Sequence, residues 1–208
     1  MPQFPKVSFE ETLKAHVLPS LCIGCATCIV VCPFDCLEYV DEKPTLVKEC
    51  KVCGICAQVC PKYNSSIPEL EQLVFGRERV SDEEFGIFHR AVIAQAVDPR
   101  IKQVCQDGGV VTALLVHALN KGVIDGAVLS GVSEAEPLKA VPKIATTINE
   151  ILECAGTRYT YSPSMLALRE GVKQKKRSLA FVGTPDQVQA FRMVQALPLK
   201  KYSEAVAF

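Results

Sequence analysis

The chain has 208 residues, 49% of them hydrophobic, which is enough for one large or two small packed domains. Its 23 basic and 23 acidic side chains balance, so we expect no basic face for phosphates and no nucleic-acid partner. No stretch approaches the ~20 apolar residues of a membrane span, and residues 1–19 lack the apolar core of an export signal. We therefore expect a cytoplasmic protein without direct membrane insertion, either free or peripheral on the cytoplasmic face of a membrane complex.

Cysteine is the unusual component of this sequence. Eleven cysteines are present, and nine of them fall between Cys22 and Cys60. Because no export signal is present, disulfide bonds explain this number poorly, and bound metal explains it better. The composition thus predicts a metal-binding N-terminal region.

The cysteines form a run that occurs twice with the spacing C-x2-C-x2-C-x3-C, each time followed by proline. The two runs are Cys22, Cys25, Cys28, Cys32 and Cys50, Cys53, Cys56, Cys60. Three cysteines at this spacing can wrap one 4Fe-4S cubane, and the fourth reaches the other cubane, as in two-cluster ferredoxins. We therefore expect a first cluster and a second cluster, held respectively by Cys22, Cys25, Cys28, Cys60 and by Cys50, Cys53, Cys56, Cys32. Structural zinc and disulfides are the less favoured alternatives.

The segment between the two runs predicts a β-hairpin. Residues 37–40 and 45–47 have the pattern of short strands, and residues 41–44 are typical of a turn. The hairpin would complete a ferredoxin-like domain over residues 1–66. Cys36 lies outside the repeat, and we expect a small buried thiol there.

The second half of the chain has a different pattern. Residues 67–90 are charged and weakly periodic, so we expect a linker with one helix at most. Beyond it, strand and helix patterns alternate. The expected strands are 91–97, 127–132 and 178–182, with helices beginning near residues 110, 147, 162 and 185. This alternation predicts an α/β domain with a largely parallel sheet over residues 91–208, and an α+β chain as a whole.

The turns before two of these helices are candidate ligand sites. Residues 106–109 and 183–185 place backbone amides at a helix start, where they can meet ligand oxygens. Glycine at a helix start is commonly structural, so neither turn alone identifies a ligand. His117 falls on an apolar helix face and is expected in the core. No residue is assigned as a catalytic acid, base or nucleophile.

Four segments, in this order, resemble the coenzyme F420 hydrogenase/dehydrogenase beta-subunit family: QDGGVVTALL, GVIDGAVLSG, GTRYTYSP and FVGTP. The paired cysteine runs make the chain most similar to the F420H2 dehydrogenase subunits of that family. The resemblance covers residues 91–208 and implies a domain that binds FAD and takes coenzyme F420 as substrate. The matching flavin-site residues are Gln106, Asp107, Gly108, Gly109, Thr112, Ser162, Pro163, Gly183, Thr184 and Pro185.

Two departures from the family pattern are evident. Asp186 stands where family members often have cysteine, and we expect it to cap the following helix. The family domain usually continues beyond this length, so we expect residues 91–208 to be an incomplete domain.

The expected function is that of an F420-dependent oxidoreductase subunit. A flavin can take a hydride and release single electrons, which is what coupling F420 to iron–sulfur clusters requires. The partners would be other subunits of an F420H2 dehydrogenase, hydrogenase or formate dehydrogenase complex. One alternative is a ferredoxin-type electron-transfer subunit without F420 chemistry of its own. Another is a subunit that has the same cofactors but receives its electrons from a donor other than F420.

Overall fold

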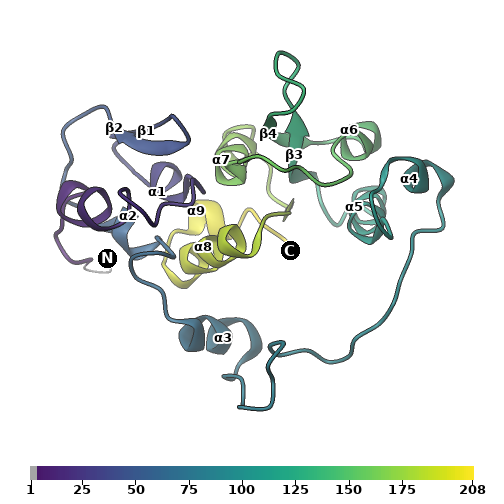
Figure 1. The fold of residues 1–208 in the computed structure, drawn as a ribbon, viewed down its shortest axis with the longest axis horizontal. Helices are drawn as coiled ribbons and strands as arrows, with labels where there is room; N and C mark the ends of the chain where they lie inside the picture. Colours follow the sequence, from purple (N-terminus) through teal and green to yellow (C-terminus); the bar gives the residue numbers. More distant parts are fainter. Residues whose placement is uncertain (1–3) are drawn as a thin grey trace.

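The ferredoxin module forms the first part of the fold in a computed structural model that describes residues 4–208. Its short elements surround the two cysteine runs (Figure 1). They are the π-helix η1 (Glu10–Lys14), α1 (Thr27–Val30), β1 (Leu37–Val40), β2 (Lys43–Leu46) and α2 (Ile55–Gln58). In the described residues, no helix is long and apolar enough to cross a membrane.

The predicted hairpin is confirmed, with a shorter turn than expected. Strands β1 and β2 pair antiparallel, and Val40 lies opposite Lys43. Only Asp41 and Glu42 form the turn, and both have left-handed backbone, with φ of 49° and 62°. Two positive-φ residues are typical of the turn whose twist matches a two-stranded hairpin. The second strand therefore begins before Thr45, where the prediction placed it.

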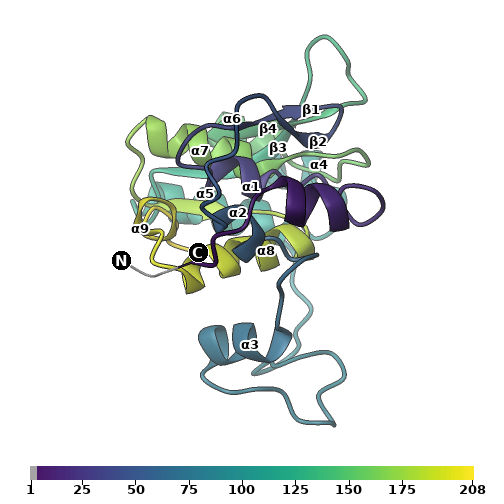
Figure 2. The same cartoon turned by 90° about the vertical axis from the view of Figure 1, so that its left-hand side faces the viewer.

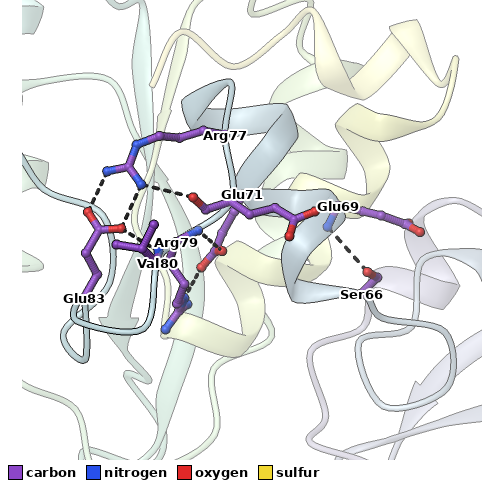
Figure 3. Close-up of polar contacts among 8 residues, drawn as sticks. Ser66, Glu69, Glu71, Arg77, Arg79, Val80 and Glu83 are labelled. Carbon is purple, nitrogen blue, oxygen red and sulfur yellow. Dashed lines mark hydrogen bonds and ion pairs between the residues drawn. The ribbon is translucent and has the colours of Figure 1, made fainter.

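The linker contains the one helix that the sequence suggested, α3 (Ile67–Phe75). Ser66 caps its start by accepting a hydrogen bond from the amide of Glu69 at 3.4 Å. Figure 2 shows α3 and the following loop projecting away from the rest of the molecule. Two ion pairs hold this loop: Arg77 binds Glu83 within the loop through two bonds of 2.7 and 2.6 Å, and Arg79 binds Glu71 of α3 (Figure 3).

The α/β region places a sheet between two groups of helices (Figure 1). Its elements are α4 (Pro99–Val104), α5 (Val110–Asn120), β3 (Gly126–Val132), β4 (Ala140–Ala145), α6 (Ile148–Glu153), α7 (Ser164–Lys173), β5 (Leu179–Phe181), α8 (Pro185–Ala196) and α9 (Lys200–Ser203). The four predicted helices are present as α5, α6, α7 and α8, while β4 was not predicted.

The prediction of a largely parallel sheet is wrong, because the sheet is mixed. Its order is β4-β3-β5, in which β3 pairs antiparallel with β4 and parallel with β5. Only residues 133–139 connect β3 to β4. A parallel pair needs a crossover of about a dozen residues or more, so this short connection permits only the antiparallel arrangement.

The predicted strand at 91–97 is also wrong. The segment forms no strand, and Val92, Ile93 and Val97 are exposed. One backbone bond, from the Ala96 amide to the Gly108 carbonyl at 2.7 Å, attaches it to the turn before α5. An apolar run becomes a strand only beside a partner, and no strand among residues 4–208 pairs with this run.

Adjacent residues of β3 point into different hydrophobic cores. Ala127 and Leu129 pack against α5 and α6, whereas Val128 faces α7 and α8. The core on the α7 side also contains Val30 and Val59 of the ferredoxin module. The two parts of the chain therefore share one core, and this core fixes the cysteine loops against α7 and α8.

Candidate functional site

The cysteines predicted for the first cluster line a single cavity. This first cysteine cavity is bounded by Cys22, Cys25, Cys28 and Cys60. Leu13, Val17 and Ile23 contribute apolar walls. Cys60, from the second run, thus lies with the first three cysteines of the first run, and their binding of one cluster stays a prediction.

The other four cysteines line a separate cavity. The second cysteine cavity is bounded by Cys32, Cys50, Cys53 and Cys56. Phe9, Leu37 and Leu46 form apolar walls. Cys36 is 3% exposed, borders this cavity and donates its thiol hydrogen to the Glu49 carbonyl at 3.3 Å, which confirms the predicted buried thiol.

Both loops turn through left-handed backbone at the start of a short helix. Ala26 precedes α1 with φ of 62°, and Gly54 precedes α2 with φ of 69°. At Gly54 a side chain is also excluded by space, because a Cβ there would lie 2.1 Å from the Pro5 carbonyl oxygen. These turns direct consecutive cysteines toward one centre.

Hydrogen-bond donors approach the sulfurs in both cavities. The amides of Phe9 and Cys36 donate to Cys50 and Cys32, each at 3.4 Å, and the Thr27 hydroxyl donates to Cys25 at 3.4 Å. Such donors stabilise the charge on cluster-bound thiolates and raise the reduction potential of a cluster.

Burial makes Cys28, Cys56 and Cys60 poor acids when no metal is bound. It raises the pKa of Cys56 to about 12 and that of Cys60 to about 11, and it raises the pKa of Cys28 strongly. Four thiolates in so apolar a cavity therefore require a bound cation. Within residues 4–208, no three Cys, His, Asp or Glu side chains converge on a single-ion site.

The first predicted flavin segment lines a pocket beside α5. Its residues Gln106, Asp107, Gly108, Gly109 and Thr112 all border this α5 pocket, together with Cys105 and Cys154, to which the sequence assigned no role. The two glycines also have a packing role. A Cβ on Gly108 would lie 2.7 Å from the Ala94 carbonyl, and one on Gly109 would lie 2.8 Å from Ile101.

The later segments border a second pocket, at the junction of the two modules. We call this the junction pocket; it is lined by Ile23, Lys62, Arg158, Tyr159, Thr160, Tyr161, Ser162, Thr184, Asp186 and Gln187. Ile23 and Lys62 also border the first cysteine cavity, so the pocket adjoins that cavity. Tyr161 approaches the same loop, since a Cβ on Gly24 would lie 3.7 Å from its ring.

The α5 pocket and the junction pocket are neighbours. Thr157 lines the former, and Arg158 and Tyr159 line the latter. Gln106 bridges them: it accepts from the Thr157 amide at 3.1 Å and donates to the Tyr159 hydroxyl at 3.2 Å. An elongated ligand could therefore extend across both pockets.

Three predicted flavin residues line neither pocket. Pro163 is buried at the start of α7, Pro185 begins α8, and Gly183 packs against Phe181 and Gln187. Asp186 is not the cap of α8, because Thr184 occupies that position. The proline and glycine residues shape the turns, and the neighbouring hydroxyl residues Ser162 and Thr184 form the pocket wall.

Sequence reasoning missed the cations and aromatic rings of the junction pocket. The Nε atom of Arg158 is buried without a hydrogen-bond partner in the described chain, while its terminal nitrogens donate to the carbonyls of Ala155 and Glu153. An orphaned guanidinium nitrogen suits an anionic ligand. Lys62 follows the Cys60–Pro61 pair, and only the fold brings it to Arg158.

Both parts of the chain match known protein families. Residues 91–169 match the N-terminal domain of the coenzyme F420 hydrogenase/dehydrogenase beta subunit, and residues 15–38 match a 4Fe-4S binding domain. The coenzyme F420-dependent sulfite reductase of Methanocaldococcus jannaschii is 32% identical over 91% of this chain and 28% of its own length. The coenzyme F420 hydrogenase subunit beta of Methanothermobacter thermautotrophicus is 40% identical over 54% of this chain and 40% of its own length.

A solved structure agrees with these matches. A chain of the F420-reducing [NiFe] hydrogenase complex from Methanosarcina barkeri superimposes with a TM-score of 0.52 and 35% identity, covering 55% of this chain and 40% of that one. This chain thus spans well under half the length of these relatives. Its residues 91–169 are similar to the N-terminal domain of the coenzyme F420 hydrogenase/dehydrogenase beta-subunit family, and in this chain they follow a region similar to a 4Fe-4S binding domain.

Proposed function

We propose that this chain passes electrons between coenzyme F420 and a partner subunit, using FAD in the α/β region and two 4Fe-4S clusters in the ferredoxin module. The observation that carries the proposal is the junction pocket, where residues of the predicted flavin segments meet residues bordering the first cysteine cavity. Bound FAD would supply the exchange between a two-electron hydride and single electrons. Relatives named as F420-dependent enzymes support F420 as the substrate.

The chain's own residues would bind and orient the cofactor. Arg158 and Lys62 offer positive charge to anionic groups, and Tyr159 and Tyr161 offer exposed rings for stacking. Ser162 is held in place from two sides. Its hydroxyl accepts from Ser130 at 2.7 Å, and its carbonyl accepts from Gln187 at 2.6 Å.

The cysteine cavities would hold the clusters away from water. Their walls are mainly apolar, and the four thiols of each cavity come from both runs. The first cluster would lie beside the junction pocket. The second cluster would lie beside Phe34 and Lys51, which border its cavity. Both residues are exposed, so a partner subunit could approach the second cluster from this side.

The test uses the full chain, purified without oxygen and reconstituted with iron, sulfide and FAD. We expect about eight irons per chain, as for two 4Fe-4S clusters, together with bound FAD. Adding F420H2 and an oxidised viologen should restore F420 absorbance and colour the viologen. Tyr161→Ala should weaken FAD binding, whereas Phe85→Ala, at a 94% exposed linker position, should not. Loaded protein that leaves F420H2 unchanged would refute the F420 step.

A second candidate is a ferredoxin-type electron-transfer subunit of a hydrogenase or formate dehydrogenase complex, without F420 chemistry of its own. One observation favours it: all eight cysteines line the two cavities, whereas residues 91–97, ahead of the predicted flavin segments, have no strand partner within residues 4–208. Flavin-free protein that still carries electrons from dithionite to a viologen, and that ignores F420H2 after addition of FAD, would support this candidate.

A further inference from the structure

Asp186 places a carboxylate in the junction pocket, which adjoins the first cysteine cavity. It is the second residue of α8 and lines the junction pocket with Ile23 and Lys62, both of which also line the cavity. The pocket and the cavity share these two wall residues, so the carboxylate of Asp186 lies near the first cavity.

The carboxylates near the second cavity are placed differently. Glu49 is paired with Lys51 at 2.7 Å, and Asp35 is paired with Arg169. Among residues 4–208, the side chain of Asp186 forms no ion pair of this kind. Its charge is thus not neutralised by a direct partner. The second cavity instead has two backbone amides directed at its sulfurs, those of Phe9 and Cys36.

We propose that Asp186 lowers the reduction potential of the first cluster and so favours movement of an electron from the first cluster to the second. The inference rests on the proposed function, because it requires clusters in both cavities. A reduced cluster carries one more negative charge than an oxidised one, so a nearby carboxylate disfavours reduction. In the step itself, the first cluster loses one electron and the second gains it, and no proton moves.

Lys62 acts in the opposite direction. It borders both the junction pocket and the first cysteine cavity, and its positive charge, like that of Arg158 in the same pocket, opposes the negative charge of Asp186 at the first cluster. Removing the charge of Asp186 leaves Lys62 unopposed. The potential of the first cluster should then rise, while the potential of the second cluster should stay unchanged because it lies in the other cavity.

Asp186 also has a structural role to be separated from this one. An acidic residue in the first turn of a helix is stabilised by the helix dipole, and Asp186 occupies that turn of α8. Asp186→Asn would therefore lower stability whether or not it affects a cluster. A helix-end effect predicts no selective change in one potential, so potentials are the informative measurement.

The experiment is a redox titration of the reconstituted full chain with dithionite, followed by electron paramagnetic resonance. Cys53→Ser, which alters the second cavity, identifies that cluster's signal. In Asp186→Asn we expect the reduction potential of the first cluster to rise by ~59 mV, which is about a tenfold change in a one-electron equilibrium between the two clusters. Asp186→Glu keeps the negative charge, so both clusters should have their wild-type potentials. Asp82→Asn removes the same charge from the exposed linker and should shift neither potential.

Each outcome decides the inference. A rise confined to the first cluster supports it, and an absent shift, or an equal shift of both clusters, overturns it while leaving the proposed function intact. A reconstituted chain without iron–sulfur signals would instead overturn the proposed function and this inference with it.

Discussion

Gly54 should be indispensable for the second cluster, and a second glycine provides a matched control. Gly54 and Gly76 both have left-handed backbone, with φ of 69° and 72°. A Cβ at Gly54 would lie 2.1 Å from the Pro5 carbonyl oxygen, whereas a Cβ at Gly76 would meet nothing within 4 Å. Gly76→Ala should therefore cost only the left-handed strain of an L-residue, about 1–2 kcal/mol.

The cost at Gly54 should be larger because backbone atoms clash. No side-chain rotation relieves a contact with a carbonyl oxygen, so either Pro5 or the loop before α2 must move. Overpacking of this kind adds about 1–3 kcal/mol to the strain. Movement of the loop would displace Cys53 and Cys56, and movement of the N-terminal segment would disturb the Phe9 amide that donates to Cys50.

Iron analysis and visible absorbance of reconstituted protein measure the effect. Gly54→Ala should retain about half of the iron, because the second cluster is lost and the first is kept. Gly76→Ala should retain all of it and show only a lower unfolding midpoint. If both variants lose iron equally, or if Gly54→Ala binds iron normally, the argument from the Pro5 contact is wrong.

Three further predictions concern stability. Leu168→Ala, in the shared core, should cost about 2–5 kcal/mol and shift cluster loss and helix unfolding together in a urea titration, while the exposed Leu114→Ala should do neither. The Arg77 side chain lowers the pKa of Glu83 to about 2, so the linker fold should be stable above about pH 4.5 and be lost as the pH falls toward 2, measurable as faster amide exchange there. Thr147→Ala removes the capping box of α6 and should cost about 1 kcal/mol in thermal unfolding.

Local signals in the sequence were sufficient to predict the elements whose stabilising contacts lie within a few residues of one another. The doubled cysteine spacing predicted which thiols share a cavity, because the loop geometry is set within a few residues. The hairpin, the capping box at Thr147 and the glycine before α5 are local in the same sense. Each depends on contacts between near neighbours in the chain.

The errors arose where structure depends on distant partners. Residues 91–97 have the composition of a buried strand, yet composition does not supply the neighbouring strand that would bury them. Strand β4 was missed for the converse reason: its polar and proline residues resemble a loop, but pairing with β3 holds it in the sheet. The mixed sheet follows directly from that unforeseen pairing.

The same difference between local and distant contacts applies to the residues of the candidate site. The cysteine sets and most of the flavin segments could be proposed from the chain, but the junction pocket could not, since Lys62, Arg158 and Asp186 come together only in the fold. Their meeting depends on the core that Val30 and Val59 share with α7 and α8. Electron transfer falls steeply with distance, and a flexible linker alone would not hold a flavin beside a cluster. The shared core removes that freedom, which is why residues 67–90 can loop outward without separating the junction pocket from the first cysteine cavity.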